Sequence, residues 1–142
     1  MYKNILLPID LVSRDTQRKA AATAAEMANK FGAKIHAMTV VPDFGMAVVG
    51  TFFPEDFEER ALAAARTDLE AFVEVEFDDD ILVHQIVAHG SIYREIIRCA
   101  NEVSSDLIIM ASHRPALRDY LLGPNAVEVI THATQSVLVV RA

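Results

Sequence analysis

Leu107–Ala111, which reads Leu-Ile-Ile-Met-Ala, is an unbroken apolar run without polar alternation. Such runs are typical of strands that are buried on both faces, as in a parallel sheet covered by helices. Lys3–Asp10, which reads Lys-Asn-Ile-Leu-Leu-Pro-Ile-Asp, is a second run of this kind and ends in a proline and an aspartate. The two stretches therefore predict two buried strands of a parallel sheet.

The rest of the chain repeats this alternation of strand and helix. Further strands are predicted over 33–41, 81–88 and 136–140, and apolar residues recur at helical spacing over 15–31, 55–75 and 124–134. Gly32 is expected to end the first helix, and Ser91 is expected to cap another helix. The inner face of the helix after Ser91 is predicted from helical spacing to be Ile92, Ile96, Ala100 and Val103. The order predicts an α/β fold, an open doubly wound five-stranded parallel sheet with helices on both faces, in a single domain over 1–142.

Composition narrows the classes of function. Of 142 residues, 52% are hydrophobic and 23% charged, as in a compact folded protein, and the net charge of −7 argues against nucleic acid as a partner. The apolar stretch Phe44–Phe53 is too short to span a bilayer, so no membrane insertion is expected. A single cysteine, Cys99, and a start without a secretory signal predict a cytoplasmic location, with Cys99 as a small core residue.

A ligand of such a sheet is expected beyond the carboxyl ends of the strands, at the switch point of strand order. There, the loop Ser112–Gly123 leaves a buried strand and re-enters a helix through Gly123-Pro124. Gly123 can adopt a backbone conformation closed to other residues, and Pro124 suits the first helical position. The N–H groups of Asn125 and Ala126 would then form an anion site at the helix start. His113, Arg114 and Arg118 could add charge-assisted hydrogen bonds from the same loop.

At these residues the chain resembles the universal stress protein family. The likeness lies in Ile109–Pro115, Leu121–Gly123 and Val137–Arg141, together with the opening Ile5–Asp10, and it covers essentially the whole chain. The residues of these motifs are most similar to those of the short ATP-binding bacterial members. The resemblance implies an adenine-nucleotide α-hydrolase-like, Rossmann-like fold that binds ATP, with Mg²⁺ as a possible companion and ADP or AMP as alternative ligands.

The resemblance also implies a nucleotide site, residue by residue. Pro8, Ile9 and Asp10 would line the base and ribose end, and Val40 would meet adenine through its backbone. The full set is Pro8, Ile9, Asp10, Val40, Gly90, Met110, Ala111, Ser112, His113, Arg114, Gly123, Pro124, Asn125 and Ala126. The family's nucleotide loop reads Gly-x-x-Gly, nine residues, then Gly-Ser or Gly-Thr. Here the two motif glycines fall on Ala111 and Arg114, the spacer is one residue shorter, and the hydroxyl residue is Pro124.

Several of these residues also have simpler interpretations that involve no ligand. Asp10 could merely cap the loop that follows it. The five histidines lack the paired spacing of metal ligands, so no metal site is predicted, and His36 and His84 are expected to be packed or edge residues. His89 borders the expected pocket as a weak candidate. Phe44–Phe53 is either folded over its own helix, or a lid or partner contact.

The function that follows is a nucleotide-dependent regulatory or stress-response module with slow or no ATP hydrolysis. No P-loop motif is present and no catalytic residue is assigned. The alternatives are a weak ATPase or nucleotide-transferring enzyme, and a nucleotide-free dimeric interaction module. The apolar last strand, Val137, Leu138, Val139 and Val140, is predicted to lie at a sheet edge and to form a homodimer, as in similar proteins. Some relatives are encoded with membrane transporters, which suggests a transporter or signalling protein as a further partner.

Overall fold

The computed structural model describes residues 1–43, 56–112 and 123–142, and its centre is a five-stranded parallel sheet. The strand order is β3-β2-β1-β4-β5. The strands are β1 (Asn4–Pro8), β2 (Lys34–Pro42), β3 (Val83–Gly90), β4 (Leu107–Ser112) and β5 (Ser136–Arg141). The chain begins in the middle of the sheet, builds outward to β3, and then returns to the other side of β1. The predicted doubly wound α/β fold is therefore confirmed.

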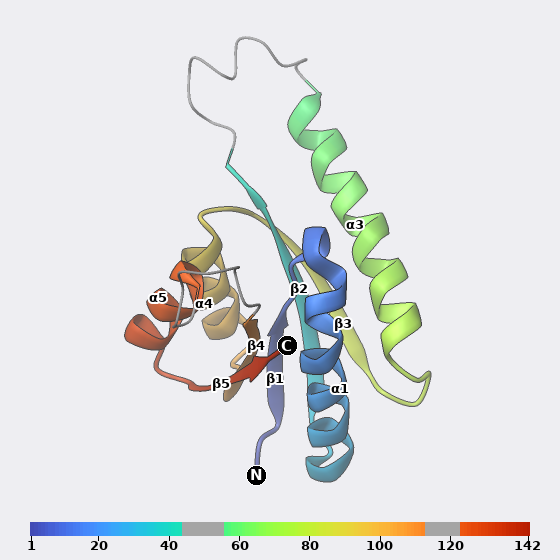
Figure 1. The fold of residues 1–142 in the computed structure, drawn as a ribbon, viewed down its shortest axis with the longest axis vertical. Helices are drawn as coiled ribbons and strands as arrows, with labels where there is room; N and C mark the ends of the chain where they lie inside the picture. Colours follow the sequence, from blue (N-terminus) through green and yellow to red (C-terminus); the bar gives the residue numbers. More distant parts are fainter. Residues whose placement is uncertain (44–55, 113–122) are drawn as a thin grey trace.

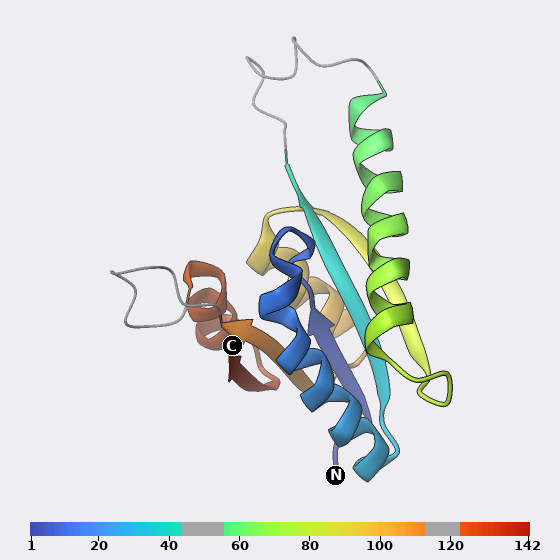
Figure 2. The same cartoon turned by 45° about the vertical axis from the view of Figure 1, so that its right-hand side comes forward.

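Helices cover both faces of this sheet (Figures 1 and 2). The helices α1 (Arg14–Phe31) and α3 (Phe57–Glu76) pack on one face, and α4 (Ile92–Glu102) and α5 (Pro124–His132) pack on the other. Ile5 and Leu7 of β1 belong to the core cluster under α1 and α3, whereas Leu6 belongs to the cluster under α4 and α5. Because successive side chains of a strand point to opposite faces, a central strand between two helical layers is apolar at every position.

Two predicted helix ends have different outcomes. Gly32 ends α1 in the left-handed conformation, with φ 67°, and its N–H donates to the Ala28 carbonyl, as predicted. Ser91 does occupy the N-cap position of α4, but its side chain makes no capping hydrogen bond. The Ser91 carbonyl instead accepts the first helical bond, from the Glu95 N–H.

The inner face of α4 differs in part from the prediction. Its buried residues are Ile96, Cys99 and Ala100, which confirms Cys99 as a core residue, whereas Ile92 is 36% exposed. Ile92 lies in the first turn of the helix and lines a cavity beyond the strand ends, so it has no sheet beneath it. Helical spacing gives the direction of a side chain around the helix but not how far the helix overhangs the sheet.

Strand β3 begins at Val83 and ends at Gly90, two residues later at each end than predicted. The Ile81 N–H donates to the Asp78 carbonyl at 3.1 Å, so the acidic turn extends to this residue before the strand starts. Phe44–Phe53, with its predicted roles as a packed loop, lid or partner contact, lies outside the described residues. None of the helices in the described ranges combines the length and apolar character needed to cross a bilayer.

A polar network occupies the amino end of the sheet. The Nδ1 atoms of His36 and His84 lie 2.9 Å apart across β2 and β3, and His36 Nε2 lies 3.1 Å from Asn4 Oδ1. His36 is 5% exposed, and this burial, followed by the charges of His84 and Lys34, lowers the pKa of His36 to about 4. The prediction that these two histidines are packed or edge residues is confirmed, because His36 is buried and His84 is exposed on the edge strand β3.

Candidate functional site

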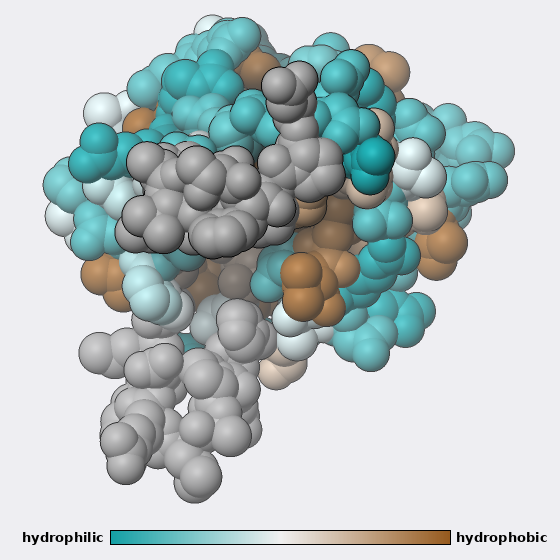
Figure 3. Space-filling model, turned by 90° about the horizontal axis from the view of Figure 1, so that it is seen from above, coloured by the Kyte–Doolittle hydropathy of each residue, from teal (hydrophilic) through white to brown (hydrophobic). Residues whose placement is uncertain are grey.

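A cavity of about 550 Å³ opens at the carboxyl ends of the strands. It lies at the ends of the neighbouring strands β1 and β4. After β1 the chain continues into α1 on one face of the sheet, and after β4 it continues towards α5 on the other face. Such a divergence leaves a crevice at the switch point of strand order. Seen from above in Figure 3, apolar side chains are visible in a hollow between polar ones.

Every predicted nucleotide-binding residue that the structure describes lines this cavity, except Gly90. The lining members of the predicted set are Pro8, Ile9, Asp10, Val40, Met110, Ala111, Ser112, Gly123, Pro124, Asn125 and Ala126. His113 and Arg114 lie outside the described residues. Gly90 pairs in register with Pro42 and has φ 133°, yet it is not among the lining residues. Its proposed close approach to a ligand stays a prediction.

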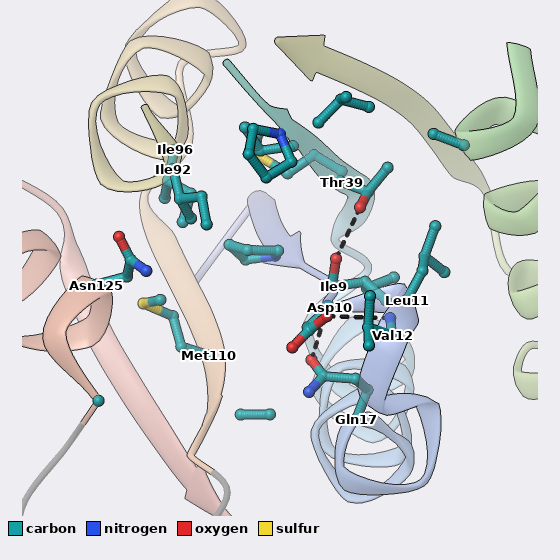
Figure 4. Close-up of a pocket in the computed structure, with 18 of the residues that line it drawn as sticks. Ile9, Asp10, Leu11, Val12, Gln17, Thr39, Ile92, Ile96, Met110 and Asn125 are labelled. Atoms are coloured by element: carbon teal, nitrogen blue, oxygen red, sulfur yellow. Dashed lines mark hydrogen bonds between the residues drawn. The ribbon is translucent and has the colours of Figure 1, made fainter. Parts of the chain in front are cut away.

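Asp10 has two structural roles at the end of β1. Its Oδ1 atom accepts a hydrogen bond from the Val12 N–H at 3.0 Å, and the residue thereby caps the short 3₁₀ helix η1 (Leu11–Ser13). Asp10 is exposed and lines the cavity, so its carboxylate also faces the space where a ligand would lie (Figure 4). The capping interpretation is therefore correct, and it does not remove Asp10 from the candidate site.

Two polar residues of the site were missed by sequence reasoning. Gln17 is 5% exposed; its Oε1 accepts from the Asp10 N–H at 3.2 Å and its Nε2 donates to Thr16 Oγ1 at 2.8 Å. Thr39 is buried on β2, and its hydroxyl donates to the Ile9 carbonyl at 3.0 Å. Both residues line the cavity and fix the backbone that follows β1 (Figure 4). The spacing of Gln17 to the buried Ala20 and Ala24 would have placed it on the inner face of its helix.

The helices α3 and α4 also form walls of the cavity, whereas the sequence had predicted them only as helices that cover the sheet. On α3 the lining residues are Ala61, Ala64, Ala65 and Asp68, and on α4 they are Ile92 and Ile96. Asp68 forms an ion pair with Arg14 of α1, with Nη2 and Oδ1 3.2 Å apart. The small alanine side chains leave space between α3 and the tip of β2, which keeps the cavity open on that side.

The start of α5 forms another wall, and there Gly123 does not use the left-handed conformation that glycine permits. Gly123 has φ −57° and ψ 161°, a conformation open to any residue, and a Cβ added there would meet no atom within 4 Å. Pro124 does occupy the start of the helix, as predicted. The Val127 N–H donates to the Gly123 carbonyl at 3.2 Å, while the N–H groups of Asn125 and Ala126 belong to the first turn, where helical partners are lacking.

The described lining is mostly apolar, with a few polar groups. Its charged members are Asp10 and Asp68, both acidic, and its neutral polar members include Gln17, Thr39, Ser112 and Asn125. Over residues 1–43, 56–112 and 123–142, no cluster of three or more acidic, histidine or cysteine side chains could hold a metal ion. A mostly apolar cavity with a few convergent polar groups is the usual form of a small-molecule site.

Fold and cavity together define a doubly wound α/β protein with a cavity at its switch point. The chain matches the universal stress protein family over residues 1–141, and it belongs to that family. It is 33% identical to universal stress protein G of Escherichia coli O157:H7, over 99% of this chain and 100% of the relative.

Solved structures share the fold at lower identity. Universal stress protein UspA from Lactobacillus plantarum is 24% identical, with a TM-score of 0.72 over 99% of this chain and 98% of that protein. A universal stress protein in complex with cAMP is 20% identical, with a TM-score of 0.60 over 99% and 97% of the two chains. The protein from Archaeoglobus fulgidus in complex with dAMP is 19% identical, with a TM-score of 0.60 over 97% of each chain.

Proposed function

We propose that this protein binds an adenine nucleotide in the cavity at the switch point and acts as a nucleotide-dependent regulatory module in the cytoplasm. ATP is the first candidate ligand, with ADP and AMP as alternatives. The observation that carries the proposal is the cavity itself, which collects residues from β1, β2, β4 and the start of α5 that the family resemblance had assigned to nucleotide contacts. Family members with this fold have been solved with cAMP and dAMP, which supports the same class of ligand here.

The lining suits the parts of such a ligand. Met38 and Met110 offer polarizable, apolar surface on which a purine ring would be removed from water. Asp10 provides a carboxylate acceptor for ribose hydroxyls at the end of β1. The first-turn N–H groups of Asn125 and Ala126 would accommodate a phosphate, aided by the positive end of the α5 dipole.

The described residues give little support for fast hydrolysis. The chain has no Gly-Lys-Ser/Thr loop, and the charged groups that line the described cavity are carboxylates rather than cations. Phosphoryl transfer depends on cations that stabilise charge on the transferred group. Mg²⁺ would enter with the phosphates and retain water ligands, since it is commonly held by substrate oxygens and one or two carboxylates. We therefore propose slow or no turnover, with ligand occupancy as the signal.

Calorimetric titration with ATP, ADP, AMP and cyclic AMP tests the proposal. We expect saturable one-site binding of at least one of these nucleotides, and competition among those that bind. Protein denatured directly after purification should also release any adenine nucleotide that it carried. Folded protein that binds none of the four at about millimolar concentration would contradict the proposal and favour the nucleotide-free interaction module.

We also propose a homodimer through β5. This strand lies at one end of the strand order, and its described residues contain neither a proline nor an inward-pointing charge that would protect an edge. Leu138 and Val140 pack with the core cluster under α1, so substitutions there would test folding rather than pairing.

Val139 is half-buried and belongs to neither core cluster. Val139→Lys is expected to convert dimer to monomer in light scattering, with an unchanged circular dichroism spectrum. The matched control, Thr131→Lys on the exposed surface of α5, should leave the mass unchanged. A Val139→Lys protein that keeps a dimer mass would rule out this interface.

A further inference from the structure

His89 lies between two carboxylates near the end of β3. Its Nδ1 atom is 3.2 Å from Glu58 Oε1, and its Nε2 atom is 3.7 Å from Asp43 Oδ1. The histidine side chain is 27% exposed, and its backbone is in register with Val41 of β2. His89 is not among the residues that line the cavity, so any effect it has on a ligand would be indirect.

Only the protonated imidazole can donate a hydrogen bond to both carboxylates in this arrangement. A neutral imidazole has one N–H donor and one lone pair, whereas an ionised carboxylate only accepts hydrogen bonds. With a carboxylate opposite each ring nitrogen, the neutral ring must direct its lone pair at one of them. The imidazolium ion presents an N–H to both carboxylates and carries the opposite charge.

The two carboxylates belong to segments that form different walls of the cavity. Asp43 directly follows β2, whose last residues Val41 and Pro42 line the cavity. Glu58 is in the first turn of α3, and Ala61 and Ala65 line the cavity from the next turns of that helix. An imidazolium at His89 therefore links the end of β2 to the start of α3 and helps to set the separation of these two walls.

Two further carboxylates of the described residues, on the neighbouring elements, are each paired with an arginine. On the α4 side, Glu95 approaches the neighbouring Gly90, with its Cγ 3.5 Å from where a Cβ of that residue would lie, and it is paired with Arg98 at 3.0 Å. At the start of α3, Asp56 is paired with Arg60 at 2.7 Å. Among the described residues, Asp43 and Glu58 have carboxylate oxygens 3.7 and 3.2 Å from the ring nitrogens of His89, so their interaction with His89 changes directly when the imidazole gains a proton.

We propose that His89 is a positioning residue of the nucleotide site and makes ligand affinity depend on pH. The inference rests on the proposed nucleotide function. Histidine is the side chain whose charge ordinarily changes between pH 5 and 8. A protonated His89 donates to both carboxylates and holds both walls, so the cavity binds its ligand more tightly. A neutral His89 loses one of the two contacts, and affinity falls. Because linkage is reciprocal, ligand binding draws a proton onto the protein.

The test compares His89→Gln with the wild type, using cyclic AMP and AMP as probes at about pH 5.5, 7 and 8.5. The ratio of wild-type to variant affinity is taken with the same nucleotide at each pH, so ionisation of the ligand's phosphate cancels. We expect the wild type to bind about two- to five-fold more tightly than the variant at the lowest pH, and equally at the highest, as two exposed ion pairs allow.

The matched control is His132→Gln on α5. Among the described residues His132 has one ion pair, with Nε2 3.2 Å from Glu128 Oε2, and it is not a lining residue of the cavity. This variant is expected to keep the wild-type profile, whereas Glu58→Gln should flatten it. Calorimetry at about pH 7 in two buffers of different ionisation enthalpy should detect proton uptake on binding by the wild type and little uptake by His89→Gln.

Two kinds of failure are distinguishable. If the wild type binds a nucleotide but His89→Gln has the same pH profile and the same proton uptake, the role of His89 is refuted while the proposed function stands. If the folded wild type binds no adenine nucleotide at any pH, the proposed function fails. Thermal unfolding of each variant identifies a loss of fold, and in that case Glu58→Gln, whose side chain is exposed, provides the deciding profile.

Discussion

The two ends of the sheet use polar side chains in opposite ways. At the amino end, His36 contacts both His84 and Asn4, and the Asp106 carboxylate accepts from the N–H groups of Lys3 and Asn4. At the carboxyl end, polar groups such as Asp10 surround a cavity of about 550 Å³. Polar groups that pair with one another contribute to the stability of the fold, whereas polar groups around a cavity can contribute to the recognition of a ligand. Substitutions at the two ends should therefore change different measurements.

The largest effect is expected at the amino end, on acid stability. Because burial lowers the pKa of His36 from 6.5 to about 4, the unfolded chain takes up a proton between these values and the folded chain does not. The stability that neutral His36 provides is complete above about pH 6.5 and is lost as pH falls towards 4, by at most about 3 kcal/mol. Urea unfolding at several pH values should show this slope in the wild type.

His36→Gln should flatten that slope by removing the titrating group. His132→Gln, at an exposed ion pair on α5, is the control and should retain it. Equal slopes for the wild type and His36→Gln over this pH range would show that the histidine pair is not the source of acid sensitivity. Nucleotide affinity at neutral pH should be the same for both proteins if the two ends are independent.

The next effect is expected at the carboxyl end, on ligand affinity. Ala65 of α3 lines the cavity, and Ala65→Trp would fill part of the space between α3 and the tip of β2. We expect nucleotide affinity to fall by about tenfold or more, equivalent to at least about 1.4 kcal/mol. Ala63→Trp is the matched control, because Ala63 is exposed on the same helix and is not a lining residue. Equal affinities for the two variants would place the ligand away from α3.

A smaller effect is expected at Thr39, which both stabilises the fold and lines the cavity. Thr39→Val removes the hydroxyl that donates to the Ile9 carbonyl and leaves a buried acceptor without this partner. The free energy of unfolding should fall by about 1 kcal/mol, and affinity should fall only modestly because the cavity keeps its shape. Denaturant unfolding and calorimetry on the same protein separate the two quantities. A large loss of affinity with unchanged stability would instead make Thr39 a direct ligand contact.

The smallest effect is expected at the start of α5. Gly123 has an ordinary negative φ and open space where a Cβ would lie, so Gly123→Ala should change the free energy of unfolding by less than about 0.5 kcal/mol. Nucleotide affinity should also change little. A marked loss of affinity without a loss of stability would mean that a ligand approaches this backbone closely enough to exclude a methyl group.

Much of the fold and part of the site could be predicted from the sequence. The unbroken apolar runs around Leu6 and Ile108 identified buried strands, and the carboxyl-end rule then selected the strand tips that line the cavity. The walls from α3 and the exposed position of Ile92 could not be predicted, because they depend on how far each helix extends past the sheet. The conformation of Gly123 could not be predicted, because glycine permits a left-handed backbone without requiring it.

The double engagement of Asp10 limits which residues can replace it. One carboxylate oxygen holds the Val12 N–H and so fixes the turn into α1, and the same side chain faces the cavity. Alanine would remove the cap and the proposed ligand contact together, whereas asparagine would keep the cap and change only the charge offered to a ligand. Related chains that have lost the ligand should therefore still carry a short capping side chain here, and only a comparison of Asp10→Asn with Asp10→Ala can separate the two contributions.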